Sequence, residues 1–426
     1  MGIQLSLTEL LNGLKILEQK EGLKTTVFCV GPMSENIMRA TLEAAKEDDF
    51  PAVFIASRNQ VDAKELGGGY VLDCDAGKFC GLIHSIAEEV GFDGLTYVCR
   101  DHGGPWQRDN ERGEKLSESE AMEKAKASYL ADLEGGFNVL HIDPTVDPHY
   151  ESYVPLKVVT ARTVELIEFV EAERKKRAIL PIGYEIGTEA TRGGLTGAGP
   201  FEQFLTDILG RLSERGLPKP DFIVGQTGTL IKMCENVGTF SSEQAKELSR
   251  IAREHGVGFK EHNADFLDEN LLKLHPELGI TGANTGPEFS AIEAKAYLGL
   301  AAMEESIEKG EIENPSNFIE IFQNASLESG RWKKWLAEGD SGLSKEDLAI
   351  DKDKLREVTL VCGRYVHDDA WVKKAVKTLF GNLEKPGVVS DPEREIIDTI
   401  KQRIRVWAEA LNLRGTTSKV MQKMGR

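Results

Sequence analysis

Eight short apolar segments, each followed by a segment with helical periodicity, constrain this chain more than any other feature of its sequence. The apolar segments are rich in Val, Ile and Phe with little alternation, which is typical of parallel strands covered on both faces. Strand followed by helix, eight times, predicts an α/β fold, the (β/α)8 or TIM barrel. The predicted strands are 25–30, 52–55, 96–100, 139–143, 182–189, 221–226, 258–262 and 278–282, and the helices after them are 35–46, 77–90, 117–133, 161–177, 201–214, 242–255, 268–274 and 288–309. A doubly wound open sheet is the structural rival, but no GxGxxG motif opens any of these helices.

The strand and helix alternation stops after about residue 315, which predicts two parts. Residues 1–315 are expected to form the barrel, with an amphipathic helix at 5–18 closing its bottom. Residues 316–426 are expected to form a helical extension that caps the barrel or makes a subunit contact. Its predicted helices are 331–336, 345–358, 369–380 and 391–411.

Charge and hydropathy narrow the classes of partner. The 52 Lys and Arg against 70 Asp and Glu give a net charge of -18, which disfavours nucleic acid and anionic lipid surfaces. No segment approaches the roughly 20 apolar residues of a membrane span, and the first 20 residues lack the apolar run of a cleavable signal. A cytoplasmic location is therefore expected. The six cysteines are scattered without a CxxC pair, so they are interpreted as reduced thiols.

Polar residues gather where the predicted strands end, and the carboxyl ends of strands are where TIM barrels place their chemistry. Merely solvated strand ends would show mixed surface residues instead. Seven of the eight strands finish in a group that can bind metal, accept a proton or hydrogen-bond a hydroxyl. These residues are Arg58, Asn59, Gln60, Asp101, His102, Asp143, Glu189, Gln226, Glu261, His262, Asp265 and Asn284.

His102 and His262 are the predicted metal ligands, because two imidazoles at strand ends with one or two carboxylates form an open site for Zn2+, Mn2+ or Co2+. Glu189 is the expected third ligand and Asp143 the fourth. The alternative is that each histidine is a hydrogen-bonded core residue. His141 is interpreted in that second way, since it lies two residues before Asp143 on the same face and deeper in the barrel.

Asp101 is the candidate general base, because a carboxylate beside a bound metal can take a proton from a substrate hydroxyl. A cap for the following turn is an equally open interpretation.

The predicted substrate contacts are amides and charged groups at other strand ends. The amides of Asn59, Gln60, Gln226 and Asn284 suit a polyhydroxylated ligand, since each both donates and accepts hydrogen bonds. Arg58 is a candidate for a phosphate or carboxylate, or else a solvated cation. Asp265 completes the set of predicted substrate contacts. The turn at 282–287 opens a helix and is a candidate anion site, unless Thr285 and Glu288 cap it internally.

Several motifs resemble one known family. They are SRNQV (57–61), GGGY (67–70), EEVGF (88–92), DHGGPW (101–106), AMEKAKASYLADLEGGFNVLHID (121–143), YEIGTE (184–189), EHNADF (261–266), TGPEFS (285–290) and RWKKW (331–335). The family is the non-catalytic subunit of class II tagatose-bisphosphate aldolase, together with related ketohexose and ketouronate 4-epimerases. DH with HID is also similar to class II aldolases at large, which implies Asp101 as proton shuttle and His102 as metal ligand. The glycine-rich histidine and phosphate motifs of those aldolases are absent, with GQTGTL at 225–230, which argues against bisphosphate cleavage.

The function expected from residues and resemblance together is metal-dependent retro-aldol chemistry on a ketohexose of the tagatose or fructose series. Asp101, with Glu261 in reserve, would deprotonate the C4 hydroxyl, and the C3–C4 bond would break. Re-addition would make the enzyme a ketose 4-epimerase acting on a free, phosphorylated or uronate sugar. Two alternatives stay open: an ancillary subunit for a separate tagatose-bisphosphate aldolase, and an aldose–ketose isomerase. Partners are therefore a small sugar, and either a second copy of the chain or an aldolase subunit.

Overall fold

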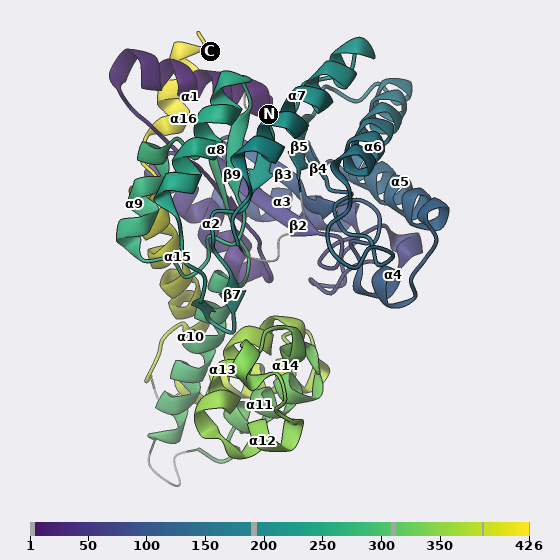
Figure 1. Cartoon of the computed structure of the whole chain (residues 1–426). Coiled ribbons are helices and arrows are strands. Elements are labelled where there is room, and N and C mark those ends of the chain that lie inside the picture. Colours follow the sequence, from purple (N-terminus) through teal and green to yellow (C-terminus); the bar gives the residue numbers. More distant parts are fainter. Residues whose placement is uncertain (1–4, 189–193, 308–311, 386, 426) are drawn as a thin grey trace.

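The computed structural model describes residues 5–188, 194–307, 312–385 and 387–425. Eight parallel strands close into a barrel in which each strand pairs with its neighbours, and the last pairs with the first (Figure 1). The predicted barrel is thus confirmed. Its strands are β1 (Val27–Val30), β2 (Ala52–Ser57), β3 (Thr96–Gly103), β4 (Val139–Ile142), β5 (Gly183–Gly187), β6 (Phe222–Gly225), β9 (Gly258–Glu261) and β10 (Gly282–Thr285).

Most of the helices around the barrel begin after an N-cap residue whose side-chain oxygen accepts a backbone hydrogen bond. Ser34, Asp75 and Ser241, for example, each accept a hydrogen bond from a backbone N–H in the first turn. These caps explain why most predicted helix starts lie within a few residues of the observed ones. The helices are α2 (Glu35–Asp48), α3 (Ala76–Val90), α4 (Asp109–Gly113), α5 (Glu118–Gly135), α6 (Leu156–Lys176), α7 (Ala198–Glu214), α8 (Ser242–Glu254), α9 (Glu269–Leu278) and α10 (Pro287–Glu305).

The eighth strand lies four residues later than the sequence predicts. The prediction was 278–282, but α9 continues to Leu278 and ends at Gly279, whose φ of 80° is the left-handed conformation that glycine tolerates. The strand itself is Gly-Ala-Asn-Thr, which carries no apolar run, so hydrophobicity could not locate it. A small hairpin, β7 (Ile231–Lys232) with β8 (Glu235–Asn236), follows β6 and was also not predicted.

Helix α15 (Pro392–Ala410) covers the barrel between α9 and α2, while α10 runs away from the barrel (Figure 1). The Trp407 ring of α15 stacks on Phe28 of β1 with centroids 5.0 Å apart. Arg394 donates to both carboxylate oxygens of Glu43 on α2, at 2.8 and 2.7 Å. The barrel wall therefore includes a helix from beyond residue 315, and the division of the chain at 315 stays a prediction.

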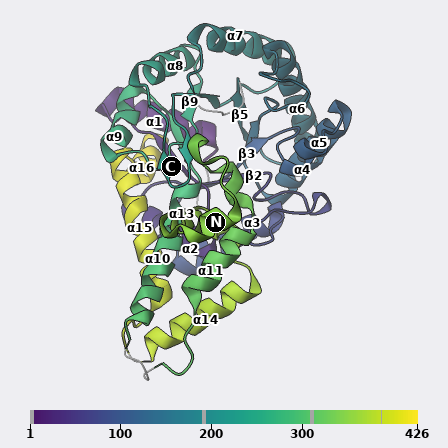
Figure 2. The same cartoon turned by 60° about the horizontal axis from the view of Figure 1, so that its bottom comes forward.

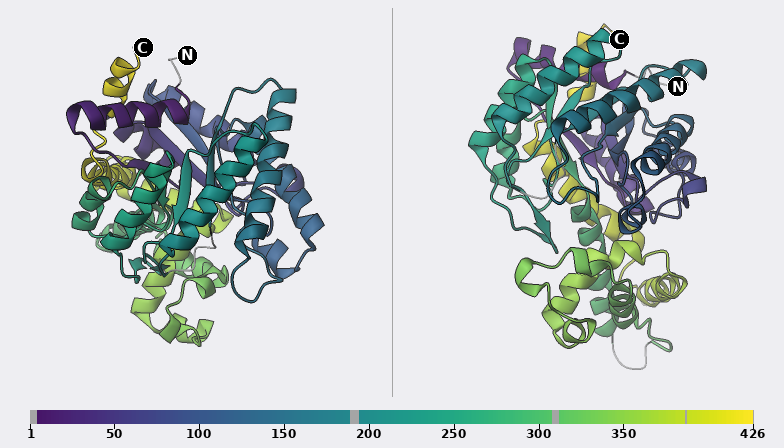
Figure 3. Two further views of the ribbon diagram at one scale, coloured as in Figure 1. Left: turned by 45° about the horizontal axis from the view of Figure 1, so that its top comes forward. Right: turned by 45° about the vertical axis from the view of Figure 1, so that its right-hand side comes forward.

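The two ends of the barrel are covered by different segments. At the amino-terminal end, α1 (Leu7–Glu21) packs its leucines against Val53 and Tyr97 inside the barrel, and α16 (Thr416–Lys423) packs on α1. Beyond the carboxyl-terminal end lies a group of helices, as Figures 2 and 3 show. This group consists of α11 (Phe318–Glu328), α12 (Lys345–Ile350), α13 (Lys352–Cys362) and α14 (Ala370–Glu384) with the short turns η2 (Arg331–Lys334), η3 (Glu338–Asp340) and η4 (Gly363–Tyr365).

The helical group is attached to the barrel through the β7–β8 hairpin and α10. Met233 packs with Trp332 and Leu336 in one apolar cluster, and its backbone N–H donates to the carbonyl of Trp335 at 3.0 Å. The predicted helix at 331–336 is a 3-10 turn, and the one at 345–358 is divided at Asp351. Within the described residues, no helix is long and apolar enough to span a bilayer.

Candidate metal and sugar site

The end of β3 has an irregular backbone that turns two consecutive side chains toward one cavity. In a regular strand Asp101 and His102 would face opposite sides of the sheet. Here the register between β3 and β4 shifts after Arg100, and His102 has a φ of 44°. Positive φ is uncommon for a residue with a Cβ, and strained conformations of this kind cluster at functional sites. Both side chains consequently line the same cavity.

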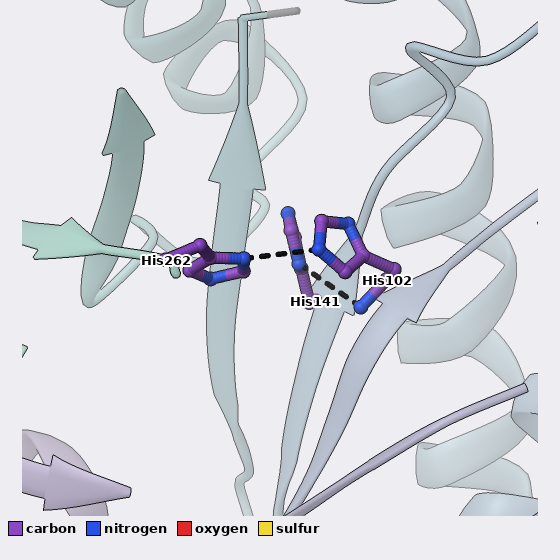
Figure 4. Close-up of side chains that lie close together, drawn as sticks. All are labelled: His102, His141 and His262. Atoms are coloured by element: carbon purple, nitrogen blue, oxygen red, sulfur yellow. Dashed lines mark hydrogen bonds between the residues drawn. The ribbon is translucent and has the colours of Figure 1, made fainter. Parts of the chain in front are cut away.

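Three imidazoles converge at the carboxyl-terminal end of the barrel, from β3, β4 and the residue after β9 (Figure 4). Nε2 of His102 and Nδ1 of His262 are 3.1 Å apart. One nitrogen from each of His102, His141 and His262 can be chosen so that all three lie within 4.8 Å of one another. The interpretation of His141 as a hydrogen-bonded core residue holds at one nitrogen, because the ring is buried and its Nδ1 accepts from the backbone N–H of His102 at 3.2 Å. Its Nε2 has no hydrogen-bond partner, and its place in the cluster was not predicted.

In His102 and His262, the ring nitrogen that points away from the other histidine is hydrogen-bonded to a carboxylate. Oδ2 of Asp143 lies 2.6 Å from Nδ1 of His102, and Oε1 of Glu185 lies 2.7 Å from Nε2 of His262. A carboxylate behind an imidazole is the usual support for a metal-binding histidine, because it fixes the tautomer and the ring orientation. Glu185 is itself held by the ammonium of Lys260 at 2.6 Å inside the barrel.

Burial and charge act in opposite directions on these groups. Burial disfavours the imidazolium of His102, but Asp101 and the hydrogen bond to Asp143 outweigh it and raise its pKa to about 9. For His141 burial dominates and lowers the pKa to about 4, so this ring is neutral. Burial alone would raise the pKa of Glu185, but the ammonium of Lys260 holds it well below its usual range.

Asp101 lies beside two of the imidazoles and is held by Asn284. Its Oδ1 is 4.0 Å from His102 Nε2, 3.7 Å from His262 Nδ1, and accepts a hydrogen bond from Asn284 Nδ2 at 3.0 Å. Burial would raise the pKa of Asp101, but the charges of His102 and then His262 lower it, which keeps the carboxylate ionised. The buried Oδ1 of Asn284 has no protein partner and can accept from a ligand hydroxyl.

These groups line a cavity of about 270 Å³ between the barrel mouth and the helical group. A volume of this size is at the lower end for small-molecule sites. The walls come from both parts of the chain. The lining residues are Gly31, Met33, Ile55, Ser57, Asn59, Gln60, Tyr70, Asp101, His102, Gln107, Arg112, His262, Asn263, Asp265, Asn284, Gly286, Pro287, Lys334, Trp335, Arg364 and Tyr365.

Of the twelve residues singled out from the sequence, seven line this cavity, four do not, and Glu189 lies outside the described residues. Arg58 is fully buried between Asp62 and Glu111. Glu261 points out of the barrel to His275 and Thr227. Gln226 is buried outside the lining, and Asp143 supports His102 from behind. Asp265 is among the seven that line the cavity, but it accepts two backbone N–H groups.

Asp265 explains why the candidate anion site at 282–287 is already filled. Its Oδ1 accepts from the N–H groups of Gly286 and Glu288, both at 2.8 Å. Burial, with Glu288 nearby, raises the pKa of Asp265 to about 7. The expected internal cap was Thr285 with Glu288; instead Glu288 faces α15, where it binds Arg403 and accepts from the indole of Trp407.

Sequence reasoning missed His141 as a member of the cluster, Glu185 and Lys260 inside the barrel, and Arg364 in the cavity wall. YEIGTE drew attention to its last residue, whereas the structure places its second, Glu185, under His262. The signal for Glu185 was a charged residue inside a strand that is otherwise buried on both faces. Arg364 carried no such signal, because nothing in the sequence places residue 364 at the barrel mouth.

Fold and site together define a class: a (β/α)8 barrel with an imidazole and carboxylate cluster at its carboxyl-terminal mouth. Within that class, residues 14–201 match the family described as the D-tagatose-1,6-bisphosphate aldolase subunit GatZ/KbaZ-like. The resemblance drawn from the motifs is thereby confirmed over this range, which is somewhat less than half of the 426 residues.

Known structures share the fold at low identity. A probable tagatose 6 phosphate kinase from Sinorhizobium meliloti 1021 has a TM-score of 0.75 at 20% identity, covering 90% of this chain and 100% of that one. A fructose-bisphosphate aldolase from Campylobacter jejuni has a TM-score of 0.55 at 14% identity, covering 98% and 97%. The fructuronate-tagaturonate epimerase UxaE from Cohnella laeviribosi has a TM-score of 0.55 at 12% identity, covering 93% and 85%. At these identities the likeness establishes the fold.

Proposed function

We propose that the chain is a metal-dependent carbohydrate enzyme that cleaves and re-forms the C3–C4 bond of a ketohexose, and that it acts as a ketose 4-epimerase. The observation that carries the proposal is the convergence of three imidazoles and the ionised Asp101 on one cavity. The family description and the names of the structural neighbours, which include an aldolase and a fructuronate-tagaturonate epimerase, support this chemistry.

The residues present fit a divalent ion such as Zn2+, Mn2+ or Co2+. Tetrahedral bonds of about 2.0–2.1 Å place two ligand nitrogens about 3.3 Å apart, close to the 3.1 Å between His102 and His262. His141 is the proposed third ligand, because one of its ring nitrogens lies within 4.8 Å of ligand nitrogens of the other two histidines. Asp143 and Glu185 orient the imidazoles of His102 and His262, in place of the ligand role expected for Asp143. When bound, such an ion acts as a Lewis acid that stabilises negative charge on the sugar oxygens.

Asp101 is the proposed base for the proton on the C4 hydroxyl. Its Oδ1 is held by Asn284 and faces the cavity, so it can accept that proton at hydrogen-bond distance. The C4 oxygen then forms a carbonyl as the C3–C4 electron pair moves toward the C2 carbonyl, leaving an aldehyde and an enediolate. If the aldehyde turns over and re-adds, Asp101 returns the proton to the opposite C4 epimer. Glu261 does not serve as a reserve base in this proposal, because it does not line the cavity and its two carboxylate oxygens bind His275 and Thr227.

Positioning of the sugar falls to the amide groups of the cavity. Asn284 on β10 offers a buried Oδ1 without a protein partner. Asn59 and Gln60 line the cavity from the loop after β2, where their amides also hydrogen-bond to neighbouring parts of the chain. A ketose presents several hydroxyls that both donate and accept, which matches amide side chains.

The test is to incubate the metal-loaded full chain with fructose, tagatose, their phosphates and the matching ketouronates, and to read the products by NMR. We expect interconversion of one C4-epimeric pair without solvent deuterium entering carbon. Asp101→Asn should retain metal and lose 10²–10⁴-fold in kcat, while the exposed Asp73→Asn should match the wild type. Turnover retained in Asp101→Asn would contradict the assignment, and deuterium on C1 or C2 would indicate an aldose–ketose isomerase instead.

A second candidate is an ancillary subunit, which the word "subunit" in the family description favours. In that role the chain would show no turnover alone and would raise the activity or stability of a tagatose-bisphosphate aldolase when mixed with it. Assaying the aldolase with and without this chain, and with its Asp101→Asn variant, separates the two functions. Equal stimulation by the variant would favour the ancillary role.

A further inference from the structure

Arg364 is a buried cation at the edge of the cavity whose charge no nearby acid neutralises. It lies in η4 of the helical group, its side chain lines the cavity, and only 3% of the residue is exposed. Among the described residues no carboxylate lies within ion-pair distance of its guanidinium. This differs from the barrel arginines, since Arg58 and Arg100 are each paired with a buried carboxylate.

The hydrogen bonds of Arg364 leave donors unused. Its Nη1 donates to the Ser290 hydroxyl at 3.4 Å and Nη2 to the Tyr365 hydroxyl at 3.2 Å, both long for a charged donor, and Nε has no partner. Burying a guanidinium with unpaired donors and no counter-charge destabilises the fold, and a bound anion would remove this penalty. The planar fork of donors matches the oxygens of a phosphate or a carboxylate.

The surroundings hold Arg364 in place without neutralising it. The guanidinium carbon lies 4.6 Å from the centroid of Trp335 and 4.9 Å from that of Tyr365, so aromatic faces support it on the helical side. Lys334 lines the same wall, is exposed, and has no acidic partner among the described residues. Asp265 lies in the same cavity, but its Oδ1 is already occupied by two backbone N–H groups.

From this arrangement we propose that Arg364, assisted by Lys334, binds an anionic group of the sugar, a phosphate or a carboxylate, at the end of the cavity formed by the helical extension. The inference rests on the proposed function for the identity of the ligand as a ketose. It adds that the substrate is charged and that the cation selecting it comes from outside the barrel. Arg58, the arginine put forward from the sequence, does not serve this purpose, since it is paired internally with Asp62 and Glu111.

The first experiment measures anion binding, independently of turnover. Inorganic phosphate and glycolate are titrated calorimetrically into the full chain and into Arg364→Gln and Arg331→Gln. Arg331 is the matched control, because it also lies over the Tyr365 ring but is paired with Asp109 and does not line the cavity. We expect saturable binding of at least one probe, weakened about ten- to hundredfold in Arg364→Gln and less than twofold in Arg331→Gln.

The anion that binds more tightly identifies the chemical source, phosphate ester or uronate. His262→Ala is the control for phosphate that binds at the imidazole cluster and not at Arg364. Phosphate binding should persist in this variant even though turnover is lost. Failure of every ketose to react would therefore overturn the proposed function and leave the anion site intact. If turnover is found, Arg364→Gln should raise KM for the charged ketose and leave KM for the neutral ketose unchanged.

Three results would overturn the proposal: no saturable binding of either probe, equal binding by the wild type and Arg364→Gln, or equal losses in Arg364→Gln and Arg331→Gln. If Arg364→Gln does not fold, Arg364→Lys and Lys334→Gln take its place. Both should weaken binding by a smaller factor, since Lys offers a point charge in place of the fork and Lys334 is exposed. Wild-type affinity in both of these variants would also overturn the proposal.

Discussion

Gly103 and Gly104 are required by the path of the chain after His102. A Cβ on Gly103 would lie 2.7 Å from the carbonyl oxygen of His141, and one on Gly104 would lie 2.5 Å from that of Asp143. Gly104 also has a φ of 130°, which side chains rarely allow. The DHGG motif therefore combines two functional side chains with the backbone that lets β3 pack against the end of β4.

Replacing Gly104 by Ala should destabilise the fold and displace His102, because the new methyl group meets backbone rather than a flexible side chain. We expect a loss of about 2–3 kcal/mol in the free energy of unfolding, together with weaker metal retention. Urea denaturation followed by circular dichroism, with metal analysis, checks both. Gly81→Ala in α3 is the control, since nothing lies within 4 Å of its Cβ and Ala favours helix by about 0.5–1 kcal/mol. Equal stability of the two variants would contradict this account of the turn.

At the residue scale, the sequence predicted those site residues that sit where a strand ends. Asp101, His102, His262 and Asn284 do meet at the barrel mouth, because strand ends of a closed barrel share one rim. The direction of a side chain just past a strand could not be predicted, since it depends on local φ and register. Glu261, the last residue of β9, points outward to His275, whereas Glu185, inside β5, reaches His262.

Helix α15 takes the place between α9 and α2 that the helix after β10 would fill in a regular barrel. Its fully buried Trp407 stacks on Phe28 and donates its indole N–H to Glu288 at 3.2 Å. Trp407→Ala should cost about 3–5 kcal/mol in the free energy of unfolding. Trp371→Ala in α14, where the ring is 72% exposed, should change it by less than about 0.5 kcal/mol. Equal urea midpoints for the two variants would show that α15 does not stabilise the barrel.

Asp221 at the start of β6 joins α1 to the barrel and gives the fold a pH dependence. Burial raises its pKa to about 6, although hydrogen bonds from Thr8 and the Tyr184 N–H oppose the shift. The stability that its protonated form contributes is complete below about pH 4 and is lost as the pH rises through 6. In Asp221→Asn the amide oxygen can accept from the Tyr184 N–H, while the Thr8 hydroxyl rotates to accept from the amide NH2. The side chain stays neutral, so the variant should be more stable than the wild type above pH 6, by up to about 3 kcal/mol.

Unfolding midpoints of Asp221→Asn and the wild type at pH 4.5 and pH 8 test this account. The advantage of the variant should grow with pH. The exposed Asp207→Asn should follow the wild type throughout. Parallel profiles for Asp221→Asn and the wild type would mean that the carboxyl group does not titrate near pH 6 in the native state.

The order of helices and strands was predictable, because periodicity and capping residues are local features of the sequence. Which elements each helix packs against was not predictable. The sequence predicts helices at 288–309 and 391–411, and both exist with altered ends. Nothing in their amphipathic patterns tells which of them covers β1. That choice depends on the pairing of Trp407 with Phe28 and of Arg394 with Glu43, contacts between residues more than 300 positions apart.

For the whole molecule, the consequence is a site assembled from two parts of the chain. The barrel contributes the imidazoles and Asp101, while the helical group contributes Lys334, Trp335, Arg364 and Tyr365 to the opposite wall. The barrel was predictable as a whole because eight repeats of one pattern leave few alternatives. For the second wall the sequence predicts only a helical extension that caps the barrel or makes a subunit contact, because no repeat or period tells which residues of 331–365 face the strand ends.

The central claim is that His102, His141 and His262 hold one divalent ion. Its most direct measurement is zinc K-edge X-ray absorption on the zinc-loaded full chain, with His141→Ala as comparison. The account predicts one zinc per chain with three imidazole nitrogens at about 2.0–2.1 Å, and two in the variant. A chain that retains no stoichiometric zinc, or a spectrum without imidazole scattering, would contradict it.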